Sequence, residues 1–296
     1  MLDVFQSSFM QIGLVASALI GITCGYLSVY VILKRLVFLA VALAQFASAA
    51  VAVSLFIGVN PMLAAFLGVM LGAVFFSWPA LGRYLPKENM IGTAYALASA
   101  TGIILIAKNA QGEEHLLNLL YGNVLTVQVT ELWMMGGIML VVGSLFLTFG
   151  KEFLFTSFDP EMARTVGVRT KLWEVFFNIS LGLVIAMAIR LGGMMLVFSL
   201  LVLPGYAALL ARCRVRNAFI WAVTMAVIAG VIGLYLSFMW DLPTSAVTMA
   251  ILGIWVVLGA VIGIVRNRVD NTTEAALRVV KTGPTLSDVL VREENI

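Results

Sequence analysis

The sequence predicts an all-α, polytopic integral membrane protein with about nine transmembrane helices and a short cytoplasmic helix. Hydrophobic residues make up 62% of the 296 residues and charged residues only 11%. In a soluble domain about a quarter of the residues are charged. The apolar residues also gather in runs near the roughly 20 residues that a helix needs to cross a membrane. Too little polar side chain remains to cover a surface that faces water.

Nine apolar runs supply the expected spans, in chain order. They lie at residues 9–33, 36–57, 61–81, 91–107, 131–149, 172–190, 193–211, 218–238 and 244–265. The seventh run is the one in which we expect breaks. Its candidate break points are Gly192, Gly193, Pro204 and Gly205, because glycine and proline interrupt helices and freed backbone is tolerated only inside protein or beside water.

Basic residues predict the orientation. With the N-terminus outside, sixteen of the eighteen Lys and Arg residues lie on the cytoplasmic side, and Lys108 and Arg190 are the two left outside. This asymmetry predicts an N-out, C-in protein of the inner or plasma membrane. Residues 1–266 would form the transmembrane domain and residues 267–296 a polar cytoplasmic tail. The asymmetry explains the net charge, so we expect lipid bilayer and no nucleic acid as a partner.

One charged segment, residues 157–171, interrupts the apolar sequence on the predicted cytoplasmic side. It contains D-P-E, in which Asp can cap a helix, Pro is favoured in the first turn and Glu complements the helix dipole. Apolar residues then follow on one face, and a glycine can end the helix. Such a helix either lies on lipid headgroups or docks into a groove of another protein. Its residues are Asp159, Pro160, Glu161, Met162, Ala163, Val166 and Gly167.

The stretch F-D-P-E-M-A-R-T-V-G-V resembles the coupling-helix segment of the ABC-3 family, the permeases of bacterial zinc and manganese ABC importers. Three further stretches agree with that family in order and spacing, so the resemblance covers about residues 10–265. They are L-L-N-L-L-Y-G-N-V-L at 116–125, M-M-L-V-F-S-L-L-V-L-P-G-Y-A-A at 194–208 and D-L-P-T-S-A at 241–246.

This resemblance implies a transport subunit and no enzyme activity. The cargo would be a zinc or manganese ion handed over by an extracytoplasmic substrate-binding protein. A separate ABC ATPase subunit would bind to the charged segment and would also bind ATP, while this chain would bind no cofactor. The family also implies pairing with a second copy of the chain or with a related permease.

One feature of the family is missing from the second span. Family members carry Asp and His there, four residues apart, so that both can reach one metal ion. Here Val41 and Gln45 stand at those positions. Three explanations stay open: a wide hydrated path, a partner permease that supplies the ligands, or a chelated or non-metal cargo. Val41, Gln45, Pro204 and Asp241 are the candidate pathway residues, and no metal ligand is assigned.

Polar residues on the predicted outer side have two interpretations. Glu113, Glu114 and His115 have side chains that can capture a metal ion, or they lie in a solvated loop. Asp241 is expected to cap the last span.

Two pairs of glycines lie four residues apart in apolar runs. They are Gly68 with Gly72 and Gly259 with Gly263. This spacing allows helices to approach closely, either within the chain or at a dimer interface.

Other classes of membrane protein fit less well. The single histidine lies in an outer loop, so a serine or zinc protease of the membrane lacks its base or ligands. An ion-coupled secondary transporter is the alternative, but the nine runs hold no Asp to carry protons. The segment at 159–167 separates these classes, because an ABC permease needs such a contact for its ATPase and a secondary transporter does not.

Overall fold

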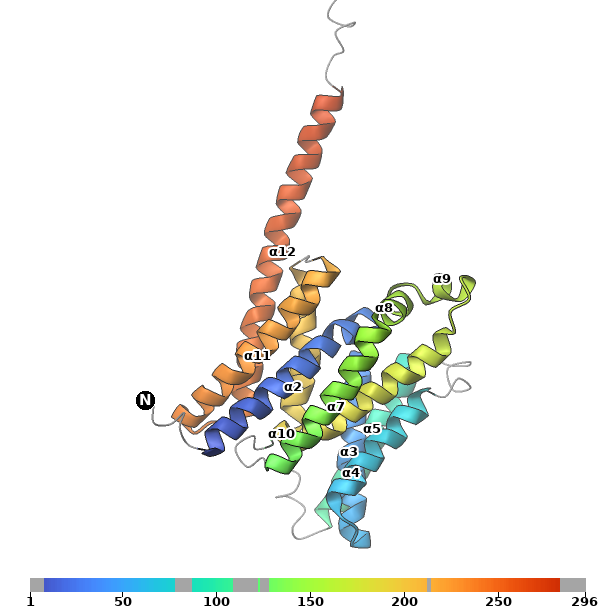
Figure 1. Ribbon diagram of the computed structural model, residues 1–296, viewed down its shortest axis with the longest axis vertical. Coiled ribbons are helices and arrows are strands. Elements are labelled where there is room, and N and C mark those ends of the chain that lie inside the picture. The colour runs from blue at the N-terminus through green and yellow to red at the C-terminus, as the bar shows by residue number, and fades with distance from the viewer. Residues whose placement is uncertain (1–7, 78–86, 109–121, 123–127, 212–213, 283–296) are drawn as a thin grey trace, which may run out of the picture.

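The computed structural model describes residues 8–77, 87–108, 122, 128–211 and 214–282, and this part of the chain is helical (Figure 1). Seven of its helices are long and apolar enough to cross a membrane, and α4 is a shorter apolar helix. The helices coincide with the expected spans, which confirms an all-α, multi-pass membrane protein. They are α2 (Ser8–Leu33), α3 (Val37–Ile57), α4 (Pro61–Ser77), α5 (Lys87–Ala107), α7 (Val129–Thr148), α8 (Gly150–Phe158), α9 (Pro160–Thr165), α10 (Thr170–Leu210), α11 (Val215–Trp240) and α12 (Thr244–Thr282).

Helix α10 covers two expected spans because the chain reverses inside it. Gly193 has φ 79° and ψ 164°, a conformation that is open to glycine and costly for other residues. The ring of Phe177, before the reversal, lies 6.2 Å from that of Tyr30 in α2. Gly205, after the reversal, lies against Ser28, also near the end of α2. The two limbs of α10 therefore run side by side in opposite directions.

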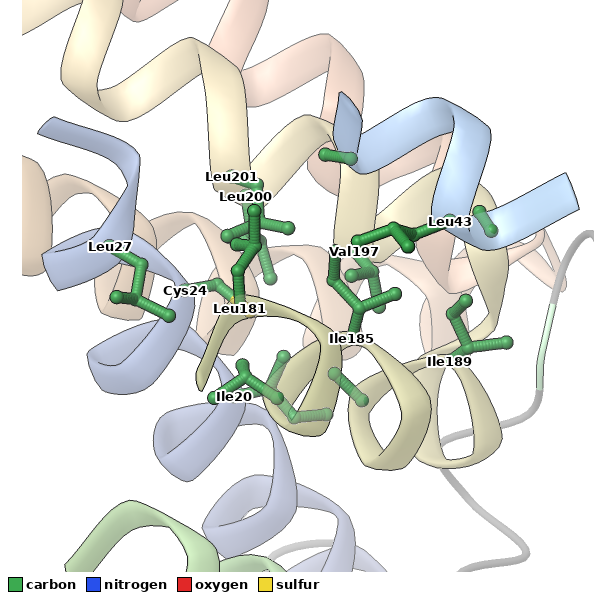
Figure 2. Close-up of a cluster of buried hydrophobic side chains, with 14 of the residues drawn as sticks. Ile20, Cys24, Leu27, Leu43, Leu181, Ile185, Ile189, Val197, Leu200 and Leu201 are labelled. Atoms are coloured by element: carbon green, nitrogen blue, oxygen red, sulfur yellow. The ribbon is translucent and has the colours of Figure 1, made fainter. Parts of the chain in front are cut away.

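Figure 2 shows the packing between these limbs. Leu181 and Ile185 of the first limb lie opposite Leu200 and Val197 of the second. All four side chains are buried in the main apolar core. The hairpin thus forms the centre of the bundle, with α2 and α4 against it.

Only one of the expected breaks in this region occurs. The second limb stays helical through Pro204, so the expectation that Pro204 and Gly205 interrupt it was wrong. The reason is packing. A Cβ atom at Gly205 would lie 2.6 Å from the backbone of Ser28, so glycine lets this limb approach α2 closely. The break occurs at Gly193, where the backbone leaves the helical conformation and the chain turns back.

Both spaced glycine pairs serve contacts within the chain. A Cβ at Gly68 would lie 2.5 Å from Ala50, and Gly72 faces the same helix α3. A Cβ at Gly259 would lie 2.6 Å from the carbonyl oxygen of Ala207, and Gly263 also faces the second limb of α10. The close contacts of these glycines are therefore made inside this chain.

The last apolar span ends at Val265, as expected, but helix α12 continues beyond it. The helix continues without a break from Thr244 to Thr282, so no helix end marks residue 266. In Figure 1 this part of α12 projects beyond the rest of the bundle. A helix of 39 residues at 1.5 Å per residue is roughly 58 Å long, which exceeds the thickness of a bilayer.

Candidate functional site: the α9 segment and the apolar route

The charged segment folds into α9, and its start follows the local chemistry. The Asp159 carboxylate accepts hydrogen bonds from the backbone N–H groups of Glu161 at 3.1 Å and Met162 at 2.9 Å. Pro160 occupies the first turn, where its missing N–H has no partner to lose. The predicted start of the helix is therefore found. A further helix, α8, precedes it and was not predicted as a separate element.

The end of α9 is fixed by Gly167. This residue has φ 90° and donates its N–H to the Arg164 carbonyl at 3.0 Å. The Val168 N–H donates to the Ala163 carbonyl at 3.0 Å. Together these two hydrogen bonds form a Schellman motif, which needs a left-handed residue at its centre. Both ends of α9 are thus closed by hydrogen bonds.

The predicted apolar face of α9 needs correction at one residue. Met162 and Val166 are 57% and 67% exposed, whereas Ala163 is fully buried. Residues four apart share a helix face and the next residue along turns away, so Ala163 points toward the bundle. The Arg164 Nε also donates to the Thr170 hydroxyl at 2.9 Å, which ties α9 to the start of α10. The exposed surface of α9 consists of Met162, Val166 and their polar neighbours.

Helix α8 connects α9 to the bundle through aromatic rings. The buried Phe153 of α8 stacks on Phe146 of α7 at 4.3 Å between ring centroids. Tyr30 of α2 lies 5.1 Å from Phe146 and 6.4 Å from Phe153. Phe177 of α10 lies 6.2 Å from both Tyr30 and Phe146. A displacement of α8 would therefore be passed directly to α2, α7 and α10.

Val41 and Gln45, the candidate pathway residues of α3, are both partly buried. The Gln45 amide Nε2 donates to the Met194 Sδ at 3.9 Å, so Gln45 contacts the residue that directly follows the reversal of α10. The second limb buries Pro204. The described residues include no group of three His, Cys, Asp or Glu side chains that could hold a metal ion. Val41 and Gln45 thus place no charged side chain on this part of α3.

The other predicted site residues lie elsewhere. Asp241 is exposed and ends α11 with φ 52°, so the expectation that it caps the last span was wrong. The backbone N–H groups at the start of α12 donate instead to the Pro243 carbonyl, at 3.1 Å for Ala246. The outer capture residues Glu113, Glu114 and His115 fall outside the described residues.

An ion pair on the predicted outer side was missed by sequence reasoning. The Arg190 Nε donates to the Glu131 Oε1 at 2.8 Å, and the second guanidinium contact is 2.5 Å. Glu131 is also the third residue of α7 and accepts the Gln128 N–H at 3.3 Å in a capping box. The sequence did contain a signal for this pair, because Glu131 and Arg190 both lie at the predicted outer ends of their spans.

A cavity of about 400 Å³ lies beside this ion pair, between α3, α4 and α10. Its lining is mostly apolar, and Arg190 supplies the charge. The lining residues are Val51, Asn60, Pro61, Met62, Ala65, Phe66, Ala186, Met187, Ile189 and Arg190.

Gly122, in the middle of L-Y-G-N-V-L, lies on the reversal of α10. It has φ 60°, and a Cβ at this position would overlap the Gly192 carbonyl carbon and the Gly193 nitrogen. Backbone packs directly on backbone here, which glycine alone permits. Gly122 and the Gly192–Gly193 pair, about 70 residues apart in the sequence, thus meet at one point.

Comparisons with known proteins agree with this fold. Residues 6–263 match the family described as the ABC 3 transport family. The chain is 31% identical over 241 residues to the manganese transport system membrane protein MntC of Listeria monocytogenes, covering 81% of this chain and 86% of that protein. It is 27% identical to the probable iron transport system membrane protein of Haemophilus influenzae, covering 83% and 90%. The fold is similar to a chain of PsaBC from Streptococcus pneumoniae in complex with Fab, with TM-score 0.76, 24% identity and coverage of 87% and 93%.

Proposed function

The chain belongs to the ABC 3 transport family, and from this premise we propose that it imports a divalent transition-metal ion, with manganese as the first candidate. It is a multi-pass membrane permease of an ABC importer. A relative named as a manganese transport protein supports manganese, and one named as a probable iron transport protein extends the class to iron. Zinc is the other divalent ion that the family resemblance implies.

The exposed surface of α9 is the proposed contact for a separate ATPase subunit that binds ATP. Met162 and Val166 present an apolar pair, and the exposed Glu161 lies beside them. Because hydrogen bonds close both ends of α9, a push on this short helix moves it as a unit. Phe153 then passes the movement to the spans that surround the pathway. An extracytoplasmic binding protein would deliver the cargo on the opposite side.

The proposed pathway passes Val41 and Gln45, and these side chains constrain how the ion travels. A dehydrated dication in mid-membrane without an anionic partner is costly. Gln45 offers one amide oxygen and Met194 a thioether, which is a weak set of ligands for manganese. We therefore propose that the ion keeps part of its hydration shell here or meets ligands from a second permease, either a copy of this chain or a related one.

A second candidate cargo is a chelated metal ion, favoured by the absence of a carboxylate or imidazole at Val41 and Gln45. Inside a chelate the metal already has its ligands. The pathway would then need room and weak polar contacts rather than charged side chains. The same absence leaves an ion-coupled secondary transporter without a proton carrier at these positions.

The experiment that tests the cargo measures ATP hydrolysis in vesicles that hold this chain, its ATPase and its binding protein. Manganese, iron(II) and zinc are offered singly to the wild type and to Val41→Asp/Gln45→His. We expect manganese to stimulate the wild type. Stimulation only in the double variant, or in neither protein, would refute a free divalent ion as cargo. Val41→Asn/Gln45→Asn, which changes the same two positions without adding a carboxylate or an imidazole, is the matched control.

A further inference from the structure

The cavity between α3, α4 and α10 lies in the outer half of the membrane on the predicted topology. Along α4 its lining runs from Asn60 to Phe66, which is about 9 Å of chain. Along α10 it runs from Ala186 to Arg190, near the end of the first limb. Its volume of about 400 Å³ lies within the range of sites that hold a small organic molecule. The cavity is therefore large enough for part of one amphiphile, close to the outer membrane surface.

Most of the cavity wall is apolar. Pro61 and Phe66 contribute to it from α4, and Ala186 and Met187 contribute from α10. Among the described residues that line the cavity, Arg190 alone carries a charge. A hydrated ion gains little from such a wall, because it would give up hydrogen bonds with water on entering. An acyl chain has no hydrogen bonds to lose, so the wall favours a molecule with an apolar tail.

The cavity adjoins the exposed apolar surface of α4. Phe66 lines the cavity and is 36% exposed, while Leu63 and Leu67 on the same helix are each 57% exposed. An exposed apolar surface of this kind on a membrane-spanning helix is suited to contact with lipid. A lipid molecule can therefore enter the cavity from the side, within the membrane.

Arg190 supplies donors for an anionic headgroup. Its Nε and one Nη nitrogen contact Glu131, whose side chain is only 11% exposed. The other Nη nitrogen has no partner among the described residues, and the Arg190 side chain is 41% exposed. A guanidinium has five N–H donors, so it can bind a carboxylate on one edge and a phosphate on another. The Glu131 carboxylate reduces the attraction, and the positive end of the α4 dipole at Pro61 adds to it.

We propose that this cavity is a binding site for an anionic phospholipid of the outer leaflet. The lipid phosphate accepts hydrogen bonds from Arg190, and one acyl chain lies in the apolar cavity against Phe66 and Met187. The bound lipid connects α4 to the first limb of α10 and so stabilises their packing. The proposal goes beyond the proposed function, because it uses the position of the cavity in the membrane and no property of the cargo.

The experiment counts the lipids that stay bound to the purified permease and its partner subunits, by native mass spectrometry. Phosphatidylglycerol and phosphatidylcholine with the same acyl chains are titrated in separate samples. We expect one phosphatidylglycerol per chain to bind severalfold more tightly, because the choline cation of the other lipid is repelled by the guanidinium. Equal binding of the two lipids would overturn the proposal. Displacement of phosphatidylglycerol by millimolar inorganic phosphate would also overturn it, since a site for the free anion needs no acyl chain.

Glu131→Gln/Arg190→Gln tests the headgroup contact. Both residues are replaced because Arg190→Gln alone would leave the buried Glu131 carboxylate without its partner. We expect phosphatidylglycerol to bind about tenfold more weakly than to the wild type, as expected for the loss of a hydrogen bond between charged groups. Its preference over phosphatidylcholine should also be lost. Thermal unfolding checks that the variant is folded, and a folded variant with wild-type affinity would refute Arg190 as the headgroup ligand.

Ala65→Leu tests the acyl-chain part of the site without changing any charge. Ala65 lines the cavity, and the larger leucine side chain fills part of it. Ala100→Leu, at an exposed position of α5 outside this lining, is the matched control. We expect Ala65→Leu to weaken the binding of phosphatidylglycerol severalfold and Ala100→Leu to leave it unchanged. The same affinity in both leucine variants would show that no acyl chain occupies the cavity.

Discussion

The proposed contact between α9 and an ATPase subunit predicts a loss of binding whose size follows from the exposure of two side chains. Met162 and Val166 are 57% and 67% exposed, so the bundle needs little from them. Covering an apolar side chain of this size completely stabilises a complex by about 1.5–3 kcal/mol. Covering the exposed parts of both side chains would therefore contribute about 2–4 kcal/mol to ATPase binding. We expect Met162→Asp/Val166→Asp to weaken binding of the ATPase by roughly 30- to 900-fold.

The assay titrates the purified permease in nanodiscs with its ATPase and follows binding and thermal unfolding together. The midpoint of unfolding should stay near the wild-type value, because exposed substitutions usually change stability by less than about 0.5 kcal/mol. Thr165→Asp adds one negative charge to α9, half that of the double variant, without changing the apolar pair, and it should bind nearly as the wild type does. Wild-type affinity in the double variant would refute α9 as the docking surface. So would an equal loss in Thr165→Asp.

Three further changes test the surroundings of this surface. Ala163→Asp places a carboxylate at a fully buried position, so we expect loss of folded protein in a size-exclusion assay rather than selective loss of ATPase binding. Phe153→Ala should lower stability by about 3–5 kcal/mol by leaving a cavity beside Phe146, and a denaturant titration will show it. Gly193→Ala forces a conformation with φ 79° on a residue with a side chain; we expect a cost of about 1–3 kcal/mol in the same titration, with Gly136→Ala as the neutral control.

The sequence predicted the positions of the membrane helices well, because a lipid environment demands long apolar runs. It also predicted both ends of α9, since Asp159 and Gly167 act on backbone within a few residues of themselves. These are local effects, and local effects can be read from local sequence.

What the sequence did not predict depends on contacts between distant segments. The direction of Ala163 is set by where α8 and α10 lie, and no spacing within a six-residue helix decides it. The pair of Glu131 and Arg190 spans 59 residues. Four residues could have broken the seventh run; the break occurs at Gly193, whereas Gly205 stays helical and packs against α2. The capture residues Glu113, Glu114 and His115 and the cytoplasmic orientation of α9 stay predictions.

The hairpin in α10 has a consequence for how the chain enters the membrane during synthesis. Its second limb, Met194 to Leu210, has 17 helical residues and is roughly 25 Å long, shorter than the roughly 30 Å hydrocarbon layer. Such a limb inserts poorly alone, so we expect both limbs to leave the translocon as a pair. Arg190 would then cross the membrane before the rest of the bundle surrounds it, and an unpaired arginine there is costly. Glu131 precedes Arg190 in the chain and is synthesised first, so its carboxylate is available to pair with Arg190 when the first limb of α10 enters the membrane.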